Sequence, residues 1–584
     1  MTQTETPYVT QAEKFTDVVQ ACVGVFASHP DAADLWQVFD DLTRAFDGLT
    51  EPDALATVAQ FMDLPGMQSV TRTLARRLTE RSGQNARAHY LYGRSLLIID
   101  RDSPEAGPAL ERAWKLDPHA DPLLPLCRAA SFIAQKRYVE AEQACRTMLE
   151  RAPDNADAYS NLAVALRLQY RPDEAVIAGE TALRIAPDHQ HAPINLALAL
   201  IDSQRFEDAL SLLRALIVDR PHDDRIRLPL GELELRFGMW ESGWANLHAR
   251  FSLAGLREQL AAREQACGVP HWRGESLEGR TLGVWLEQGY GDAILLIRFL
   301  PLIAERVRAL GGKLVFGCFG PLVELFRPLI PEDVELNVDF LRATDFHIPL
   351  MSCGAPFAFG NATLPGHAYL RADDQQVARW RERMGIGDGR LHVALAWTGN
   401  PGQVRNDARS LPMDQLENLL AARDVVFHSV NPSAGEVVAA LRERGFDIID
   451  ASPDLHDFSA TAALLLAADA VVTTCTSVAH LGGAVGARTF LMLDRTGSFV
   501  WGTEELRSPW YDSIHIVRQA RFGDWRDVVQ RVRETLASMQ DAPAPAGQIV
   551  EDATDPRATP ARIARKNKAD KASRKAGRSA RAHR

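Results

Sequence analysis

The first candidate for chemistry is a glycine-rich turn that carries a carboxylate. The apolar run Thr281–Trp285 is followed by Glu287-Gln-Gly-Tyr-Gly-Asp292, and a helical pattern comes next. Gly289 and Gly291 would let a ligand approach the backbone, and the start of a helix favours an anion. Asp292 either belongs to such a site or simply caps the helix. The order of strand, glycine turn and helix predicts a binding loop at the carboxyl end of a strand.

A second candidate lies where the run Ala470–Thr474 leads into another helix. Thr476 and Ser477 supply hydroxyl groups there, and His480 follows one turn later. Hydroxyls and unpaired backbone N–H groups at a helix start suit a phosphate or diphosphate, and the imidazole can reach the same anion. The alternative is a buried histidine with a structural role.

A third candidate is the loop after the run Leu391–Trp397, which contains Asn400, Arg405, Arg409 and Ser410. Guanidinium groups clasp phosphate oxygens with two parallel hydrogen bonds. Arg409 is the first choice for such a contact and Arg405 the second. A solvated basic loop is the alternative interpretation.

Metal chemistry is not expected. The only DxD sequence, Asp100-Arg-Asp102, is better interpreted as solvated charge or a helix cap. The seven cysteines are scattered without a CxxC pair, and no His/Cys cluster has the spacing of metal ligands. The cysteines are therefore expected to be reduced and mostly buried.

The three candidate loops need parallel sheets to position them. Short apolar runs alternate with helical patterns in the second half of the chain, which predicts βα units. They form two Rossmann-like sets, over residues 270–385 and 388–540. The predicted strands are Thr281–Trp285, Lys313–Phe319, Asp345–Leu350, Leu391–Trp397, Val425–Val430, Ala470–Thr474 and Thr489–Leu493.

The first half has a different pattern, which repeats at a fixed period. Ala163, Ala175 and Pro187 recur as Ala197, Ala209 and Pro221 in the following unit, and as Ala129, Ala141 and Pro153 in the preceding one. Small residues let two antiparallel helices approach closely, and the closing proline ends the second helix. With a period of about 34 residues, the pattern resembles the tetratricopeptide family over residues 85–250. Residues 1–84 are predicted to be a helical region without the repeat consensus.

Charge is distributed unevenly along the chain. Residues 557–584 carry eleven Lys/Arg and one acid, which gives this segment a net charge of about +10. Because the net charge of the whole chain is −11, the remainder carries about −21. An acidic folded body argues against nucleic acid as the main partner. Residues 541–584 are predicted to be a disordered basic tail. No apolar run approaches membrane-spanning length and no secretory signal is recognisable, so the expected compartment is the cytoplasm without membrane insertion.

Four stretches together resemble bacterial tetratricopeptide-fused glycosyltransferases, relatives of the heptosyltransferases and, more distantly, of O-linked N-acetylglucosamine transferase. They are PHWRGESLEGRTLGVWLEQGYGD, LHVALAWTGNPGQVRNDARSLP, DFSATAALLLAADAVVTTCTSVAHLGGAVG and RSPWYDSIHIVRQ. The resemblance implies a tetratricopeptide solenoid followed by a GT-B-like double Rossmann domain. It also implies transfer of a sugar from a UDP- or CMP-linked donor, without a separate cofactor, to Ser/Thr of a protein held by the repeats, with flagellin as the best single guess.

The same resemblance assigns roles to the candidate residues. Asp292 would be the catalytic base, and the loop with Arg409 would reach the donor phosphates. Cys475 stands where relatives carry an acid, which questions the usual nucleotide contact. The competing hypotheses are a catalytically inactive repeat scaffold and, with less support, a heptosyltransferase acting on a membrane-embedded acceptor.

Overall fold

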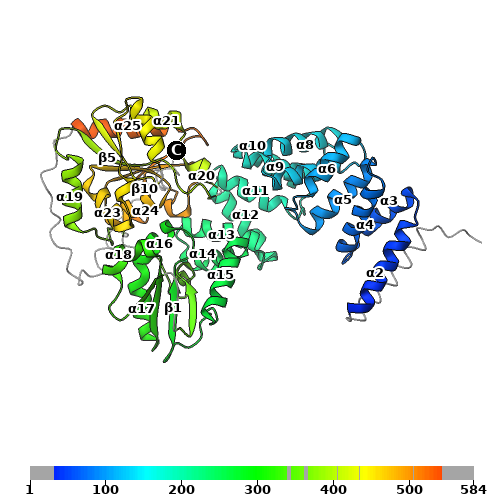
Figure 1. Ribbon diagram of the computed structural model, residues 1–584, viewed down its shortest axis with the longest axis horizontal. Coiled ribbons are helices and arrows are strands. Elements are labelled where there is room, and N and C mark those ends of the chain that lie inside the picture. The colour runs from blue at the N-terminus through cyan, green and yellow to red at the C-terminus, as the bar shows by residue number, and fades with distance from the viewer. Residues whose placement is uncertain are drawn as a thin grey trace, which may run out of the picture. The chain divides into compact units, whose positions relative to one another are not determined.

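The computed structural model describes residues 32–62, 64–338, 344–360, 366–403, 405–432, 434–503 and 506–541. Helices alone fill this part of the chain up to residue 267, and two sheets with their helices follow (Figure 1). The start of the predicted N-terminal helical region and the predicted basic tail beyond residue 541 lie outside the described residues.

The helical part is an array of antiparallel pairs. From α3 to α14, helices that follow one another in the chain pack against each other. The bounds are α2 (Ala32–Asp47), α3 (Glu51–Met62), α4 (Gln68–Arg81), α5 (Ala86–Ile99), α6 (Ala106–Leu116), α7 (Leu124–Ala134), α8 (Tyr138–Arg151), α9 (Ala156–Leu168), α10 (Pro172–Ile185), α11 (Ala192–Asp202), α12 (Phe206–Asp219), α13 (Asp224–Arg236), α14 (Trp240–Leu247), η1 (His248–Ser252) and α15 (Ala254–Cys267).

The recurrence seen in the sequence is visible in the packing of the repeats. The predicted small residues at the helix–helix contacts are at most 1% exposed: Ala129, Ala163 and Ala197 on the first helices, and Ala141, Ala175 and Ala209 on the second helices. A side chain larger than alanine at these places would separate the helices. The predicted tetratricopeptide-like array is therefore confirmed as a fold.

The turn inside each pair recurs with the same period. Lys136, Tyr170, Gln204 and Gly238 all have left-handed backbone, with φ of 61°, 64°, 65° and 71°. After each of them the next N–H bonds back into the preceding helix, as Arg171 does to the carbonyl of Leu166 at 3.0 Å. This is a Schellman-type helix end, which reverses the chain within a few residues.

The first sheet is parallel, with strand order β3-β2-β1-β4. Its central strand β1 is the one that leads into the glycine turn. The elements are β1 (Thr281–Trp285), α16 (Tyr290–Leu296), η2 (Ile297–Phe299), α17 (Leu300–Ala309), β2 (Lys313–Cys318), α18 (Val323–Phe326), β3 (Glu335–Val338) and β4 (Phe346–Pro349).

The second sheet has the order β10-β11-β9-β8-β5-β6-β7, and only β10 is antiparallel to its neighbour. The two strands that carry candidate loops, β5 and β8, are adjacent, so their carboxyl ends lie side by side. The elements are α19 (Asp374–Met384), β5 (Leu391–Ala396), α20 (Asn406–Arg409), α21 (Met413–Leu420), β6 (Val425–Ser429), α22 (Gly435–Glu443), β7 (Ile448–Asp450), α23 (Phe458–Ala467), β8 (Ala470–Thr474), α24 (Ser477–Val485), β9 (Thr489–Leu493), η8 (Phe499–Trp501), β10 (Arg507–Ser508), β11 (Tyr511–Arg518) and α25 (Arg526–Asp541).

All seven predicted strands are present, three of them with the predicted bounds. The strands β3, β7, β10 and β11 were not predicted from the sequence: β3 and β7 are short and partly exposed, β10 has two residues, and β11 lacks a continuous apolar run because polar residues interrupt it. Across the described residues, no helix combines the length and the apolar character that a membrane span requires.

Candidate functional site

The glycine turn after β1 places Asp292 in the first turn of α16. Gln288 has a φ of 61°, a strained conformation for a residue with a side chain. The N–H of Gly289 donates to Oδ2 of Asp292 at 3.4 Å, so the carboxylate caps the helix. Burial raises the pKa of Asp292 to about 6; the Gly289 N–H opposes this shift and the charge of Glu287 adds to it. A carboxylate that titrates near neutral pH suits general-base chemistry.

A buried ion pair fixes the backbone just before this turn. Arg250 of η1 donates to both carboxylate oxygens of Glu287, at 3.2 and 2.6 Å, and to Oγ of Ser352 at 2.8 Å. Both charged side chains are 3% exposed. Such a pair stabilises only while both members are present, because either one alone would be an uncompensated buried charge.

The start of α24 presents the second predicted group. Oγ1 of Thr476 accepts from the N–H of Val478 at 3.3 Å, so Thr476 is the helix cap. Ser477 is half-buried, and its hydroxyl makes no hydrogen bond within the described residues. His480 is 7% exposed, its ring stacks on Trp501 with centres 5.0 Å apart, and its Nδ1 lies 3.0 Å from the hydroxyl of Tyr511.

The protonation of His480 follows from these surroundings. Burial, with a smaller effect of the nearby Arg298 charge, lowers the pKa of His480 to about 3. The imidazole is therefore neutral at physiological pH. It can contact an anion only as a neutral hydrogen-bond donor, not as a cation.

Cys475, at the position where the sequence resemblance led us to expect an acid, makes a specific contact. Its Sγ accepts from the indole N–H of Trp501 at 3.2 Å, and its carbonyl accepts from Arg409 at 2.9 Å. Burial raises the pKa of the thiol to about 11, so the side chain is uncharged. Position 475 thus has no carboxylate, and the sulfur of Cys475 is the acceptor for the indole N–H of Trp501.

Arg409 lies at the junction of the two candidate loops of the second sheet. Besides the carbonyl of Cys475, it contacts Oδ1 of Asn406 at 3.4 Å. A Cβ on Gly399 would be 2.5 Å from Nη2 of Arg409, so a larger residue at position 399 would displace the guanidinium. Ser410 supports the same loop, because its hydroxyl lies 2.8 Å from that of Thr398.

Arg405 and Asn400 point to other partners. Arg405 donates to Oδ2 of the buried Asp494 at 2.9 Å and to the hydroxyl of Thr496. Asn400 is exposed and accepts from the N–H of Gly402 at 2.9 Å, which closes a turn. The sequence grouped these side chains with Arg409, but in the structure each has a local partner. Their donor-binding role stays a prediction.

The loops of the two sheets meet at Gly291. A Cβ on Gly291 would lie 2.9 Å from Cδ2 of His480 and 3.6 Å from Cα of Ser477. Helices α16 and α24 pack against each other accordingly. Both follow the carboxyl end of a parallel strand, β1 or β8, which is where open α/β sheets bind ligands. The structure thus brings Gly291, which lies in the same turn as Gly289 and Asp292, to Ser477 and His480, with Arg409 linked to the start of α24 through Cys475.

Sequence reasoning missed several residues of this site. Tyr511 and Trp501 hold the ring of His480, and Asn431 holds the Arg409 loop through the backbone of Trp397 and Thr398, at 2.9 and 2.6 Å. Tyr511 lies in RSPWYDSIHIVRQ, one of the four stretches that carry the family resemblance, and its neighbour Trp510 is fully buried. Arg250 and Asn431 carried no local signal.

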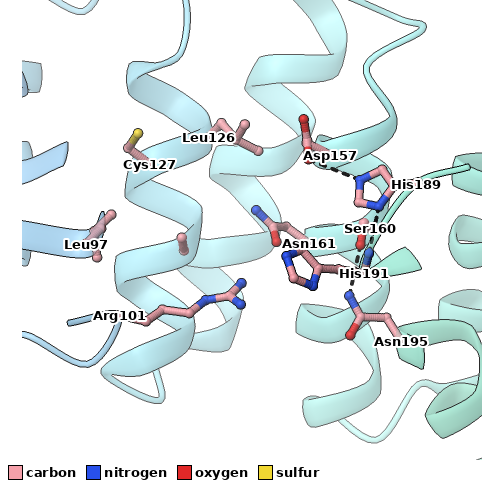
Figure 2. A pocket seen from close by; sticks show the side chains of 11 residues that line it. Leu97, Arg101, Leu126, Cys127, Asp157, Ser160, Asn161, His189, His191 and Asn195 are labelled. Carbon is pink, nitrogen blue, oxygen red and sulfur yellow. Dashed lines mark hydrogen bonds and ion pairs between the residues drawn. The ribbon is translucent and has the colours of Figure 1, made fainter. Parts of the chain in front are cut away.

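The helical array contains a separate cavity of about 230 Å³, lined only by residues of the array (Figure 2). Leu97, Leu126 and Cys127 line one side, and polar side chains from α9, α11 and the turn before α11 line the other. His189 accepts the N–H groups of His191 and Ala192 through Nδ1, and its Nε2 contacts Asp157 at 3.1 Å. Asn195 donates to Ser160 at 2.9 Å.

Two cavity side chains keep unused donors. Arg101 and Asn161 make no side-chain hydrogen bond in the part of the chain that the structure describes. An apolar wall opposite polar donors can accommodate a peptide segment with one apolar side.

No group of three or more His, Cys, Asp or Glu side chains among the described residues could hold a metal ion. In the DxD sequence, Oδ1 of Asp100 accepts from the N–H of Asp102 at 3.0 Å, which is a local turn contact.

Known proteins resemble parts of this chain. The tetratricopeptide repeat family model matches residues 132–177 and 166–233. Protein FlbA of Caulobacter vibrioides is 31% identical over 337 residues, which cover 52% of this chain and 53% of FlbA. The match therefore spans about half the length of that relative.

Solved structures resemble separate parts. A tetratricopeptide protein of Thermus thermophilus matches 30% of this chain and 97% of its own, at 21% identity and a TM-score of 0.27. A glycosyl transferase of family 9 from Veillonella parvula matches 46% of this chain and 92% of its own, at 10% identity and a TM-score of 0.32.

Proposed function

We propose that this protein is a nucleotide-sugar-dependent protein O-glycosyltransferase. The observation that carries the proposal is the contact of Gly291 with Ser477 and His480. It joins a carboxylate of raised pKa, Asp292, to a helix start that offers hydrogen-bond donors. A base and an anion site side by side are what transfer from a phosphate-linked donor to a hydroxyl requires.

In this proposal the two sheets form a GT-B-like pair, and the phosphate group of the donor lies at the start of α24. The hydroxyl of Ser477 and the Nε2 side of His480 contact its oxygens. Arg409 lies next to this place, on the carbonyl of Cys475, and supplies positive charge. Charge on the leaving group, UDP or CMP, is then stabilised by Arg409 and the helix start, so no metal ion is needed. UDP leaves as a diphosphate and CMP as a monophosphate, and both present anionic oxygens to these groups.

The acceptor in this proposal is a protein, held by the repeats. The cavity between α5, α7, α9 and α11 has an apolar wall and the unused donors of Arg101 and Asn161. A segment of the acceptor binds there while a Ser/Thr hydroxyl reaches Asp292. Flagellin, modified in the cytoplasm, is the specific acceptor that we propose, on the sequence resemblance.

Mass spectrometry tests the proposal directly. The purified chain is incubated with flagellin and each of several UDP- and CMP-sugars, and a mass increase equal to one sugar residue on Ser/Thr is expected. Asp292→Asn and Arg409→Ala should abolish the increase, while Arg308→Ala, at an exposed ion pair, should not. If no donor gives a mass increase with a folded chain, the enzyme proposal is wrong.

Two observations favour the alternative, an inactive scaffold. Arg405 is engaged by Asp494, and Cys475 supplies a thiol where the sequence resemblance predicts an acid. A scaffold would keep its biological effect in the Asp292→Ala and Arg409→Ala variants, whereas an enzyme would lose it. Calorimetry with UDP and CMP separates the two more quickly, because a scaffold with a collapsed site binds neither.

A further inference from the structure

The ring of His480 is held in one orientation by three contacts. Trp501 stacks on one face at 5.0 Å, with the planes 30° apart. The Cδ2–Nε2 edge faces Gly291, where a Cβ would be 2.9 Å from Cδ2 and 3.5 Å from Nε2. Nδ1 faces the other way, 3.0 Å from the hydroxyl of Tyr511. The two ring nitrogens therefore have different surroundings.

The direction of the Tyr511–His480 hydrogen bond follows from the groups around the phenol. The guanidinium of Arg298 lies over the ring of Tyr511, with Cζ 4.8 Å from its centre, and donates to the carbonyls of Leu295 and Trp510, each at 3.0 Å. A guanidinium has no acceptor atom, so the proton of the buried phenol needs an acceptor elsewhere.

The neighbouring Tyr369 already uses its own proton. Its hydroxyl donates to the carbonyl of Ile294 at 2.6 Å. The hydrogen bond that the geometry gives to the Tyr511 hydroxyl is the one with Nδ1 of His480. Nδ1 then accepts and is unprotonated, and the single proton of the neutral imidazole is on Nε2.

We propose that Tyr511 is a positioning residue that fixes His480 as its Nε2–H tautomer, so that the Nε2–H group beside Gly291 and Ser477 donates to an anionic phosphate oxygen of a bound nucleotide. The tautomer is a property of this chain alone, whereas the ligand rests on the proposed function.

Other observations agree with this assignment. Burial keeps the pKa of His480 near 3 and raises the pKa of Tyr511 well above its usual value, so both groups stay neutral over the physiological range. Nε2 makes no hydrogen bond within the described residues, and the residue keeps 7% exposure. A neutral donor contributes the same hydrogen bond throughout this pH range.

The tautomer is measured by two-bond ¹H–¹⁵N NMR on the full chain labelled with ¹⁵N-histidine. The His480→Gln variant identifies the signals by their loss. We expect a pyridine-like Nδ1 and a pyrrole-like Nε2 for His480 in the wild type. Tyr511→Phe removes only the hydroxyl, and we expect the Nδ1–H tautomer of His480 to become populated in this variant. Tyr369→Phe, the matched control, should leave the Nε2–H form unchanged.

Two results would overturn the proposal: an Nδ1–H tautomer in the wild type, or an unchanged Nε2–H tautomer in a folded Tyr511→Phe protein. If that variant does not fold, the wild-type spectrum alone decides.

Calorimetry with UDP and CMP tests the ligand half. Loss of the oriented donor should weaken the affinity of Tyr511→Phe about tenfold, and Tyr369→Phe should bind as the wild type does. Equal affinities of the wild type and Tyr511→Phe would contradict this half. If neither nucleotide binds the wild type, the proposed function fails and the NMR result still stands.

Discussion

Gly291 and His480 are far apart in the chain, and yet no side chain fits between them. A Cβ on Gly291 would be 2.9 Å from Cδ2 of the imidazole, closer than carbon atoms approach. The contact joins the first turn of α16 to the second turn of α24, so it sets the distance between the loops of the two sheets.

Gly291→Ala should therefore disturb the site more than the fold. The imidazole must move by a few tenths of an ångström or more, which misplaces its Nε2, and we expect nucleotide affinity to fall at least about tenfold. Gly289→Ala is the matched control, because its Cβ would meet only Oδ2 of Asp292, at an ordinary 3.6 Å. Calorimetry with UDP and CMP, alongside a thermal melt, measures both effects. Equal affinities of the two variants would contradict the prediction.

The pH dependence of transfer should report Asp292. Its pKa is raised to about 6, so the fraction of Asp292 in the base form increases as pH rises through 6. We therefore expect kcat/KM to rise with pH over the same range. Asp292→Asn should lose activity by at least about a hundredfold, within the range usual for a general base. Asp292→Glu keeps a carboxylate and should retain part of the activity. A flat profile between pH 5 and 7 would exclude Asp292 as the base.

The ion pair of Arg250 and Glu287 should show strong coupling. Arg250→Met leaves Glu287 charged and buried, and we expect a loss of about 3–5 kcal/mol in the free energy of unfolding. The double variant with Glu287→Met should lose less than Arg250→Met alone, because no unpaired charge remains. Arg308→Met, in an exposed pair with Asp333, should cost at most about 1 kcal/mol. Urea unfolding of the four proteins gives the comparison.

Acid should destabilise the fold through buried histidines. His347, His428 and His480 have pKa values lowered to about 4, 4 and 3, mainly by burial. Below their ordinary value near 6.5 the unfolded chain binds protons that the folded chain does not. Each histidine then removes up to roughly 1.4 kcal/mol per pH unit as pH falls between the two values. Asp292, with its raised pKa, acts in the opposite direction between about 4 and 6.

The measurement for this prediction is the thermal midpoint between pH 7.5 and 5. Histidines with a lowered pKa, which also include His248 at about 4, outnumber the two carboxyls with a raised pKa among the described residues, Asp292 and Glu232, and this predicts a falling midpoint. His428→Asn should flatten the slope if the variant folds, and the absence of any slope in the wild type would contradict the prediction.

A surface turn of the repeats offers a stabilising change. Lys136 is exposed and has a φ of 61°, and the equivalent position of a later repeat is occupied by a glycine, Gly238. Lys136→Gly should stabilise the array by about 0.5–1 kcal/mol, because relief of left-handed strain exceeds the entropy that glycine loses. Lys136→Ala keeps the strained backbone and should give no gain. Chemical unfolding that ranks the glycine variant below the alanine variant would refute this.

Much of the fold was predictable because its signals are local. The periodic recurrence of Ala163, Ala175 and Pro187 indicated the helical array, and apolar runs such as Ala470–Thr474 indicated strands with the correct bounds. Both depend on which face of a helix or strand is buried, and this is written in residue spacing. The same logic located the candidate loops after β1, β5 and β8.

The partners within the site were not predictable in this way. Arg405 and Arg409 lie in the same loop and are equally basic, yet one is held by Asp494 and the other by the carbonyl of Cys475. Nothing in the loop itself distinguishes them, because the acceptors come from the end of β9 and from the start of α24.

The amino-acid sequence by itself determined the elements and the residue types at the ends of the strands. The tertiary structure decided that Gly291 meets His480, that Tyr511 holds Nδ1 of that ring, and that Arg250 sits against Glu287. Helix and strand formation depends on neighbours within a few residues, whereas these contacts depend on how two sheets pack over long sequence separations. Burial, which sets the pKa values of Asp292 and His480, exists only once that packing has formed.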